Sequence, residues 1–237
     1  MKKNILTLVM GSIVFTSCVK EELASPLIPV ERCVSQKINP SGISYSKDSV
    51  VAFSSNQKFC GMLPLSTRNF WIYEDSVYQD GIFLRVQKDT LRYTAVLKSI
   101  PDGLVWWESN ITVGLPDRLL TNDSAIYKLE ERLFIPDIMD AKKDFSLFPG
   151  DSIRYLTSFE DAAAQGRSLK INYGYNSFLG NLSDCLYFEK NARNYRKDQV
   201  FFKPGIGVLK YIREEASPGQ RVIKLQQIST LVDFHIE

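Results

Sequence analysis

The sequence predicts a mainly β protein, built on a curved antiparallel sheet or an open barrel with one or two short helices. Aromatic and β-branched residues are frequent, and Gly, Pro, Asn and Asp interrupt them at short intervals. This texture is typical of antiparallel strands joined by tight turns. Residues 90–99 alternate between apolar and polar side chains, as a strand with one buried face does. A series of such strands must curl to protect its apolar face, which favours a curved sheet.

Strands are expected wherever a β-rich run is bounded by turn residues. Asp80-Gly81 predicts a hairpin, and Pro101-Asp102-Gly103 predicts another reversal. The predicted strands cover residues 50–53, 69–78, 82–88, 90–99, 104–109, 125–135, 153–159, 169–175, 184–195, 200–203, 206–214 and 221–236.

Three segments in the middle of the chain carry weaker or helical signals. Residues 125–135 fit a strand better than a short helix, and both alternatives stay open. Pro136 is suited to opening a helical turn over 136–145, since proline is tolerated at the first helical position. Residues 160–166, with three alanines and a closing glycine, are the best helix candidate.

The N-terminus has the pattern of a secretory signal. Lys2 and Lys3 give a basic start, residues 5–15 are uncharged and mostly apolar, and small residues precede Cys18. The apolar run is shorter than the about 20 residues that a membrane-spanning helix needs. Prolines then mark a semi-extended spacer. The sequence therefore divides into a signal peptide at 1–17, a lipidated N-terminus and tether at 18–44, and a single antiparallel β domain at 45–237.

Phe15-Thr16-Ser17-Cys18 resembles the lipobox of bacterial lipoproteins, in the looser form common in Bacteroidetes. The resemblance implies cleavage before Cys18, a diacylglycerol on its sulfur and usually a third acyl chain, such as palmitate, on its amine. Several acyl chains hold a protein on a membrane durably, because each buried CH₂ contributes about 0.8 kcal/mol. Lys20-Glu21-Glu22 resembles the signal that sends many such lipoproteins to the outer face of the outer membrane. The resemblance implies exposure at the cell surface, and ordinary tether charges are the alternative.

Charge excludes several classes of partner. The chain has 29 Lys and Arg against 27 Asp and Glu, so removal of Lys2 and Lys3 with the signal leaves an even balance. No run of like charge stands out. This argues against nucleic acid, which needs a clustered basic face, and against a polybasic membrane-binding surface.

The cysteines favour a disulfide over a metal site. With Cys18 acylated, Cys33 and Cys60 are the candidate disulfide, which the cell envelope permits, and three free thiols are the alternative. Cys185 lies in an apolar run and is expected to be a small core residue. None of the spacings matches a zinc or redox motif.

Catalytic signatures are missing from the sequence. The chain has one histidine, His235, and no nucleophile elbow, phosphate loop or dinucleotide fingerprint. Its adjacent acidic pairs, such as Glu130-Glu131, point to opposite faces of a strand and do not form a glycosidase pair by themselves. No cofactor or metal is expected, and a hydrolase that uses two distant acids stays an alternative.

Aromatic residues are the main candidates for ligand contact. Trp71, Trp106 and Trp107 have rings suited to stacking on a sugar or to lining an apolar pocket. The alternative is that they form the core. Trp106 and Trp107 are adjacent in a predicted strand, so they must point to opposite faces.

A repeated tripeptide suggests modification. Asp followed by Ser or Thr and an apolar residue resembles the O-glycosylation motif of Bacteroidetes, which implies sugars on Ser49, Ser76, Thr90, Ser124 and Ser152. The alternative is that these pairs mark turns before strands.

Taken together, these features predict a non-enzymatic lipoprotein of the outer membrane. Its sheet resembles lipocalin-like and lipoprotein-carrier architectures, in which a concave sheet holds a lipid. The expected partner is an apolar or glycan ligand, or an envelope protein. The alternatives are a structural accessory subunit of an envelope complex and a carboxylate-based hydrolase.

Overall fold

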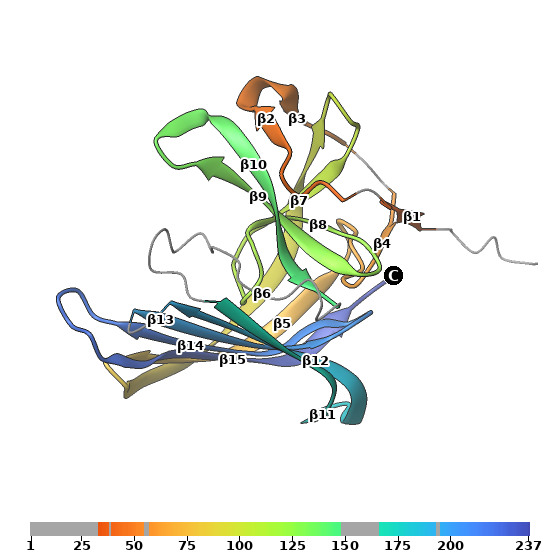
Figure 1. Cartoon of the computed structure of the whole chain (residues 1–237). Helices are drawn as coiled ribbons and strands as arrows, with labels where there is room; N and C mark the ends of the chain where they lie inside the picture. Colours follow the sequence, from red (N-terminus) through yellow and green to blue (C-terminus); the bar gives the residue numbers. More distant parts are fainter. Residues whose placement is uncertain (1–32, 38, 55–56, 148–165, 193–194) are drawn as a thin grey trace, which may run out of the picture. The chain divides into compact units, whose positions relative to one another are not determined.

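A curved antiparallel sheet makes up most of the described chain (Figure 1). The computed structural model describes residues 33–237 apart from 38, 55–56, 148–165 and 193–194, all within one compact unit that spans 32–237. The sheet has 13 strands and does not close into a barrel, which confirms the mainly β prediction. Within the described residues, the helical structure is limited to the 3-10 turn η1 (Lys47–Ser49).

The strands follow one another in the sheet in the order β11-β12-β13-β14-β15-β5-β6-β7-β8-β9-β10-β2, and β3 also pairs with β6. A separate parallel pair joins β1 to β4. Their bounds are β1 (Val34–Ser35), β2 (Ser44–Ser46), β3 (Val50–Ala52), β4 (Phe59–Cys60), β5 (Phe70–Gln79), β6 (Ile82–Ser99), β7 (Val105–Ser109), β8 (Arg118–Thr121), β9 (Ala125–Arg132), β10 (Ile135–Ser146), β11 (Gly166–Ser177), β12 (Gly180–Ala192), β13 (Arg196–Lys203), β14 (Gly207–Ala216) and β15 (Ile223–His235).

Strand β6 is the element that turns one sheet into two facing lobes. Its first part, residues 82–92, pairs with β5, and residues 93–98 pair with β7 across a bulge near Tyr93. A bulge bends a strand and increases its twist. We call β11–β15, β5 and residues 82–92 lobe A, and we call residues 93–99, β7–β10, β2 and β3 lobe B.

The break that the sequence predicts at Asp89 does not exist, because β6 runs through it without a turn. Asp89 lies directly opposite Tyr73 of β5, and its carboxylate accepts a hydrogen bond from Gln87 at 2.8 Å. A strand position with a cross-strand partner and a local donor satisfies the aspartate as well as a turn would.

The last strand of the chain lies inside lobe A and not at its edge. β15 pairs with β14 on one side and with β5 on the other. Gln227 therefore lies directly opposite Val77, although the two residues are far apart in the sequence. The C-terminal strand thereby joins the hairpins of β11–β14 to the rest of the sheet.

The main core fills the space between the two lobes. Phe188 of lobe A packs against Phe145 of lobe B with ring centroids 4.1 Å apart, and Trp107 belongs to the same cluster. Trp106 lies in a second cluster on the other face of lobe B, with Tyr45 against its edge. The prediction that the two adjacent tryptophans point to opposite faces is confirmed.

Residues 33–44, which the sequence assigns to the tether, belong to the folded unit. Gln36 is buried and exchanges two hydrogen bonds with the backbone of Val105, at 2.8 and 3.0 Å. Ile43 packs on the second cluster, and Pro40 is buried. Proline density indicated a spacer, but these residues cover an apolar face of lobe B that the strands alone leave open.

The helical turn predicted over 136–145 is wrong, because this segment is strand β10. It pairs with β9 along most of its length, and alternate residues such as Met139 and Ala141 are buried in the second cluster. The run 125–135 is a strand up to Arg132, and β8 is a strand that the sequence analysis did not predict. The strand predicted at 153–159 and most of the helix predicted at 160–166 lie outside the described residues.

Candidate functional site

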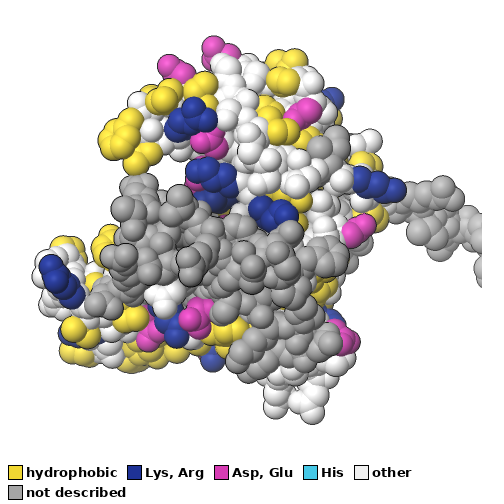
Figure 2. Space-filling model, viewed as in Figure 1, with side chains coloured by type: hydrophobic (Ala, Val, Ile, Leu, Met, Phe, Trp, Pro, Cys, Tyr) yellow, Lys and Arg dark blue, Asp and Glu magenta, His cyan; other side chains and the backbone are white. Residues whose placement is uncertain are grey.

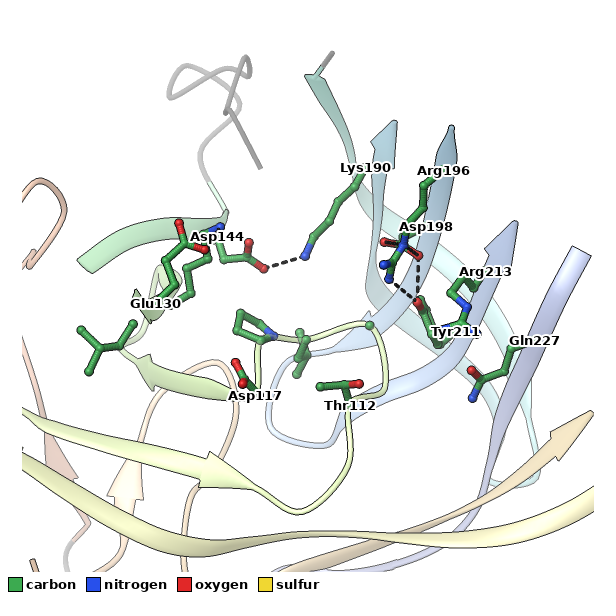
Figure 3. A pocket seen from close by; sticks show the side chains of 15 residues that line it. Thr112, Asp117, Glu130, Asp144, Lys190, Arg196, Asp198, Tyr211, Arg213 and Gln227 are labelled. Atoms are coloured by element: carbon green, nitrogen blue, oxygen red, sulfur yellow. Dashed lines mark hydrogen bonds and ion pairs between the residues drawn. The ribbon is translucent and has the colours of Figure 1, made fainter. Parts of the chain in front are cut away.

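A polar cavity of about 310 Å³ lies between the two lobes (Figure 3). Lobe A supplies side chains from β12–β15, and lobe B supplies β9, β10 and the loop between β7 and β8. The lining is rich in charge of both signs. It consists of Thr112, Gly114, Leu115, Pro116, Asp117, Lys128, Leu129, Glu130, Asp144, Lys190, Arg196, Asp198, Tyr211, Arg213 and Gln227.

Strand register explains why lobe A presents a polar row to the cavity. Lys190 is opposite Asp198, Asp198 is opposite Arg213, and Arg213 is opposite Gln227 on four consecutive strands. Directly opposite residues share a face of the sheet, so all four side chains lie in one line across it. The next row on that face is mostly apolar and belongs to the core.

The floor of the cavity on lobe A is a hydrogen-bonded network. The Tyr211 hydroxyl donates to Asp198 Oδ1 at 2.8 Å, and Arg196 contacts both of them, at 3.2 Å to Asp198 Oδ1 and 3.3 Å to the Tyr211 oxygen. Burial and the adjacent Asp198 carboxylate raise the pKa of Tyr211 well above its ordinary value. Tyr211 is therefore a neutral hydroxyl that is fixed in direction by its neighbours.

Lobe B contributes a carboxylate between two ammonium groups. Glu130 lies 2.7 Å from Lys128 Nζ and 2.6 Å from Lys142 Nζ. Burial disfavours the charged form of Glu130, but the two lysines outweigh it and lower the pKa of this carboxyl. Lys128 is almost fully buried, and its ammonium makes an ion pair with Glu130 without hydrogen-bond geometry.

An ion pair joins the lobes across the cavity. Lys190 of β12 donates to Asp144 Oδ2 of β10 at 2.9 Å, and both side chains are at least nine-tenths buried. The Lys190 ammonium also lies 4.5 Å from the centre of the Phe145 ring, which is within the range of a cation–π contact. This pair links β12 of lobe A to β10 of lobe B within the cavity lining.

Arg213 is the cation with the weakest partner in the lining. Its Nε is buried without a hydrogen-bond acceptor, and the nearest carboxylate oxygen, on Glu215, is 3.8 Å away. The neighbouring Gln227 amide donates to Ser229 at 2.9 Å and to Asp75 at 3.4 Å. A buried donor without an acceptor is uncommon in native proteins, so Arg213 is the least satisfied cation of the lining.

Gly114 seats the β7–β8 loop against the cavity floor. Its φ is +70°, and a Cβ here would lie 2.7 Å from the Val200 side chain and 2.8 Å from the Tyr211 ring. Only glycine adopts this conformation in this space without displacing its neighbours. The loop residues Thr112 and Asp117 line the cavity as a result.

The tryptophans are not in this site. Trp71, Trp106 and Trp107 are all 0% exposed, so the structure removes them as residues that stack on a ligand. The Nε1 of Trp71 donates to the backbone oxygen of Ile206, which ties β5 to the β13–β14 turn. Large aromatic rings contribute most when fully buried, and the core uses all three.

The remaining candidates are spread over the described unit. Cys33 and Cys60 form a disulfide, Cys185 is a buried free thiol, and His235 is exposed and stacks on Phe70. Cys18 lies outside the described residues. In the described part of the chain, no group of three or more His, Cys, Asp or Glu residues is arranged to hold a metal ion.

The copies of the Asp-Ser/Thr tripeptide motif lie in different kinds of secondary structure. Ser49 ends η1 and Ser124 lies in the β8–β9 turn, but Ser76 and Thr90 are half-buried in the middle of β5 and β6. Ser152 lies outside the described residues. The alternative reading of these pairs as turns before strands is therefore wrong for Ser76 and Thr90.

The sequence alone does not indicate the residues that build the cavity, because they come from several strands. One signal was present in β13, where Arg196 and Asp198 share a strand face with Val200 and Phe202. A charge in phase with buried apolar residues indicates a polar group turned toward the interior. The partners on other strands depend on register, which the sequence did not supply.

Comparisons with protein-family models, curated proteins and solved structures gave no significant match. Across the residues that the structure describes, no helix has the length and apolar character needed to cross a bilayer.

Proposed function

We propose that this protein binds a glycan in the cavity between its lobes while a lipid on Cys18 holds it on the outer membrane. The observation that carries the binding proposal is the line of donors and acceptors from Lys190 to Gln227, set against the lysines and acids of lobe B. The anchor rests on the lipobox resemblance, and surface exposure rests on the residues that follow Cys18.

The polarity of the lining favours a glycan over a lipid. A sugar hydroxyl is both donor and acceptor, so it is satisfied by alternating ammonium, guanidinium and carboxylate groups. An apolar ligand would strip water from those charges without replacing its hydrogen bonds, which is unfavourable. The apolar side chains between the lobes are instead packed on one another in the core.

The same lining favours binding over hydrolysis. A glycosidase needs a carboxylic acid whose pKa is raised enough to donate a proton near neutral pH. Glu130 has its pKa lowered by Lys128 and Lys142, which is the opposite arrangement. Asp75, whose pKa is raised, is buried and does not line the cavity. A binding site requires only that charges be fixed in place, and the network around Tyr211 fixes them.

A panel of neutral, acidic and amino-sugar oligosaccharides tests the proposal. The full chain with Cys18→Ser is first screened against the panel on an array. It is then titrated with each panel member that it retains. Arg213→Gln should weaken binding about tenfold, the loss expected for one charge-assisted hydrogen bond. Arg68→Gln, at an exposed arginine outside the cavity, should leave the affinity unchanged. Retention of no saccharide, or equal affinity in both variants, would overturn the proposal.

A further inference from the structure

Two hairpins of this protein end in exposed apolar side chains. The β5–β6 hairpin exposes four in a run of five residues, and the β9–β10 hairpin exposes three in succession. They are Ile82, Phe83, Leu84 and Val86 at the first tip, and Leu133, Phe134 and Ile135 at the second tip. We call these groups the 82–86 tip and the 133–135 tip.

The backbone at the 133–135 tip is strained for its sequence. Leu133 and Phe134 form a two-residue turn between β9 and β10, a position where Asn-Gly or Asp-Gly is strongly preferred. Phe134 adopts a φ of +66° and is 92% exposed. A non-glycine residue in this region costs about 1 kcal/mol or more, and an exposed phenylalanine gains nothing in return from folding. A contact of Phe134 outside the described residues would offset this cost.

The arrangement of the tips restricts what that contact is. Both hairpins end on the left side of Figure 1, and Figure 2 shows apolar side chains in two separate groups on that side. At the 82–86 tip, apolar side chains are exposed on both faces of the strand, since Phe83 and Leu84 are neighbours along it. A flat protein surface covers only one face of such a projection. A bilayer surrounds the whole tip.

Basic residues stand beside the 82–86 tip. Arg85 lies within it, and Lys224 of β15 lies next to Gly81. Among the described residues neither of these two cations makes an ion pair, although Glu215 lies opposite Lys224 across β14 and β15. The acid of the turn, Asp80, accepts a hydrogen bond from Ser217. These cations come from segments far apart in the sequence, which is why no run of basic residues indicates them.

We propose that the 82–86 and 133–135 tips lie in the interface of an anionic lipid bilayer, where Arg85 and Lys224 contact the phosphates. Ile82 and Leu84 are about 7 Å apart along an extended strand, within the roughly 5–10 Å that interfacial elements enter. Deeper entry is opposed by the open edge of β6, whose backbone groups lack partners in hydrocarbon. This contact is independent of the ligand in the cavity.

Tryptophan reporters test the insertion at each tip. The native tryptophans are fully buried, so Phe83→Trp and Phe134→Trp each add one exposed indole to the full chain with Cys18→Ser. Vesicles of phosphatidylglycerol and phosphatidylcholine should shift the emission of both reporters to shorter wavelength. Lipids brominated on the acyl chains should quench them. Phosphatidylcholine alone should give a smaller change at Phe83→Trp.

Phe178→Trp is the matched control. Phe178 is 52% exposed at the tip of the β11–β12 hairpin, against 53% for Phe83, but its hairpin lies at another end of the sheet. Its emission should not change with vesicles. Equal quenching at Phe178 would indicate general adsorption and overturn the proposal. So would unchanged emission at Phe83 and Phe134, which would leave a protein partner as the occupant of the tips.

Discussion

The buried carboxyl group of Asp75, in the core of lobe A, makes the free energy of unfolding depend on pH. The side chain is 3% exposed, and its Oδ1 has no hydrogen-bond partner. Burial raises the pKa of Asp75 to about 6, and Asp89 adds to the rise while hydrogen bonds from Ser229 and Gln227 oppose it. The folded protein therefore holds this proton at a pH where the unfolded chain has released it.

The sign and size of the effect follow from this difference. The pKa is about 6 in the folded state against a reference value of 3.8, so the folded state binds more protons than the unfolded state between these values. The free energy of unfolding contributed by this group is then highest below pH 4 and falls as the pH rises to 6. At about 1.4 kcal/mol per pKa unit, the loss is about 3 kcal/mol at neutral pH.

Asp75→Asn removes the ionisation and keeps the shape of the side chain. The amide oxygen accepts from Gln227, and the amide nitrogen donates toward Asp89. We expect the variant to be more stable than the parent chain by about 2–3 kcal/mol at pH 7.5 and equally stable at pH 4. Stability is measured by urea unfolding at four or more pH values, followed by the fluorescence of the buried tryptophans.

Asp137→Asn, at an exposed aspartate, is the control and should change stability little at any pH. The comparison isolates the Asp75 site because each variant replaces one aspartate and leaves every other carboxylate in the chain. A variant that is destabilised at pH 7.5, or whose difference from the parent chain does not depend on pH, would refute the reasoning.

Three further perturbations test the packing. Gly114→Ala should lower the free energy of unfolding by about 2–4 kcal/mol, since its Cβ would lie 2.7 Å from a β13 side chain, whereas Gly205→Ala has open space and should cost about 1 kcal/mol by urea unfolding. Lys190→Met should cost about 3 kcal/mol in thermal unfolding, because it removes the ammonium group from a buried ion pair with Asp144. Reduction of Cys33–Cys60 should lower stability by about 3–4 kcal/mol, read from melting curves with and without reductant, and an unchanged curve would contradict the cross-link's role.

Local pattern predicted the strands where one face is buried and turns are explicit. The strand at 90–99 and the Asp80-Gly81 turn both lie where the sequence predicts them, but the alternation shifts at the bulge near Tyr93, so Val96 is buried in place of Ala95. The pattern failed at 136–145, where Pro136 indicated a helix start, because pairing with β9 decides the structure there. It failed again at 33–44, where prolines indicated a spacer and burial against lobe B prevails.

The candidate site was harder to predict than the fold. Its central row joins Lys190, Asp198, Arg213 and Gln227, which meet only when four strands pair in one register. No spacing along the chain encodes that meeting. The tryptophans drew attention instead, because their chemistry suits a ligand, but the same chemistry suits a core.

The central place of β15 has a consequence for synthesis. The ribosome synthesises the chain from its N-terminus. β5 therefore lacks its partner β15 until the final residues have been made. Long-range pairing of this kind is slow, so this part of lobe A is completed only after the last strand has been synthesised. Truncation near position 223 should therefore yield a product in which β5 and β14 both lack their shared neighbour.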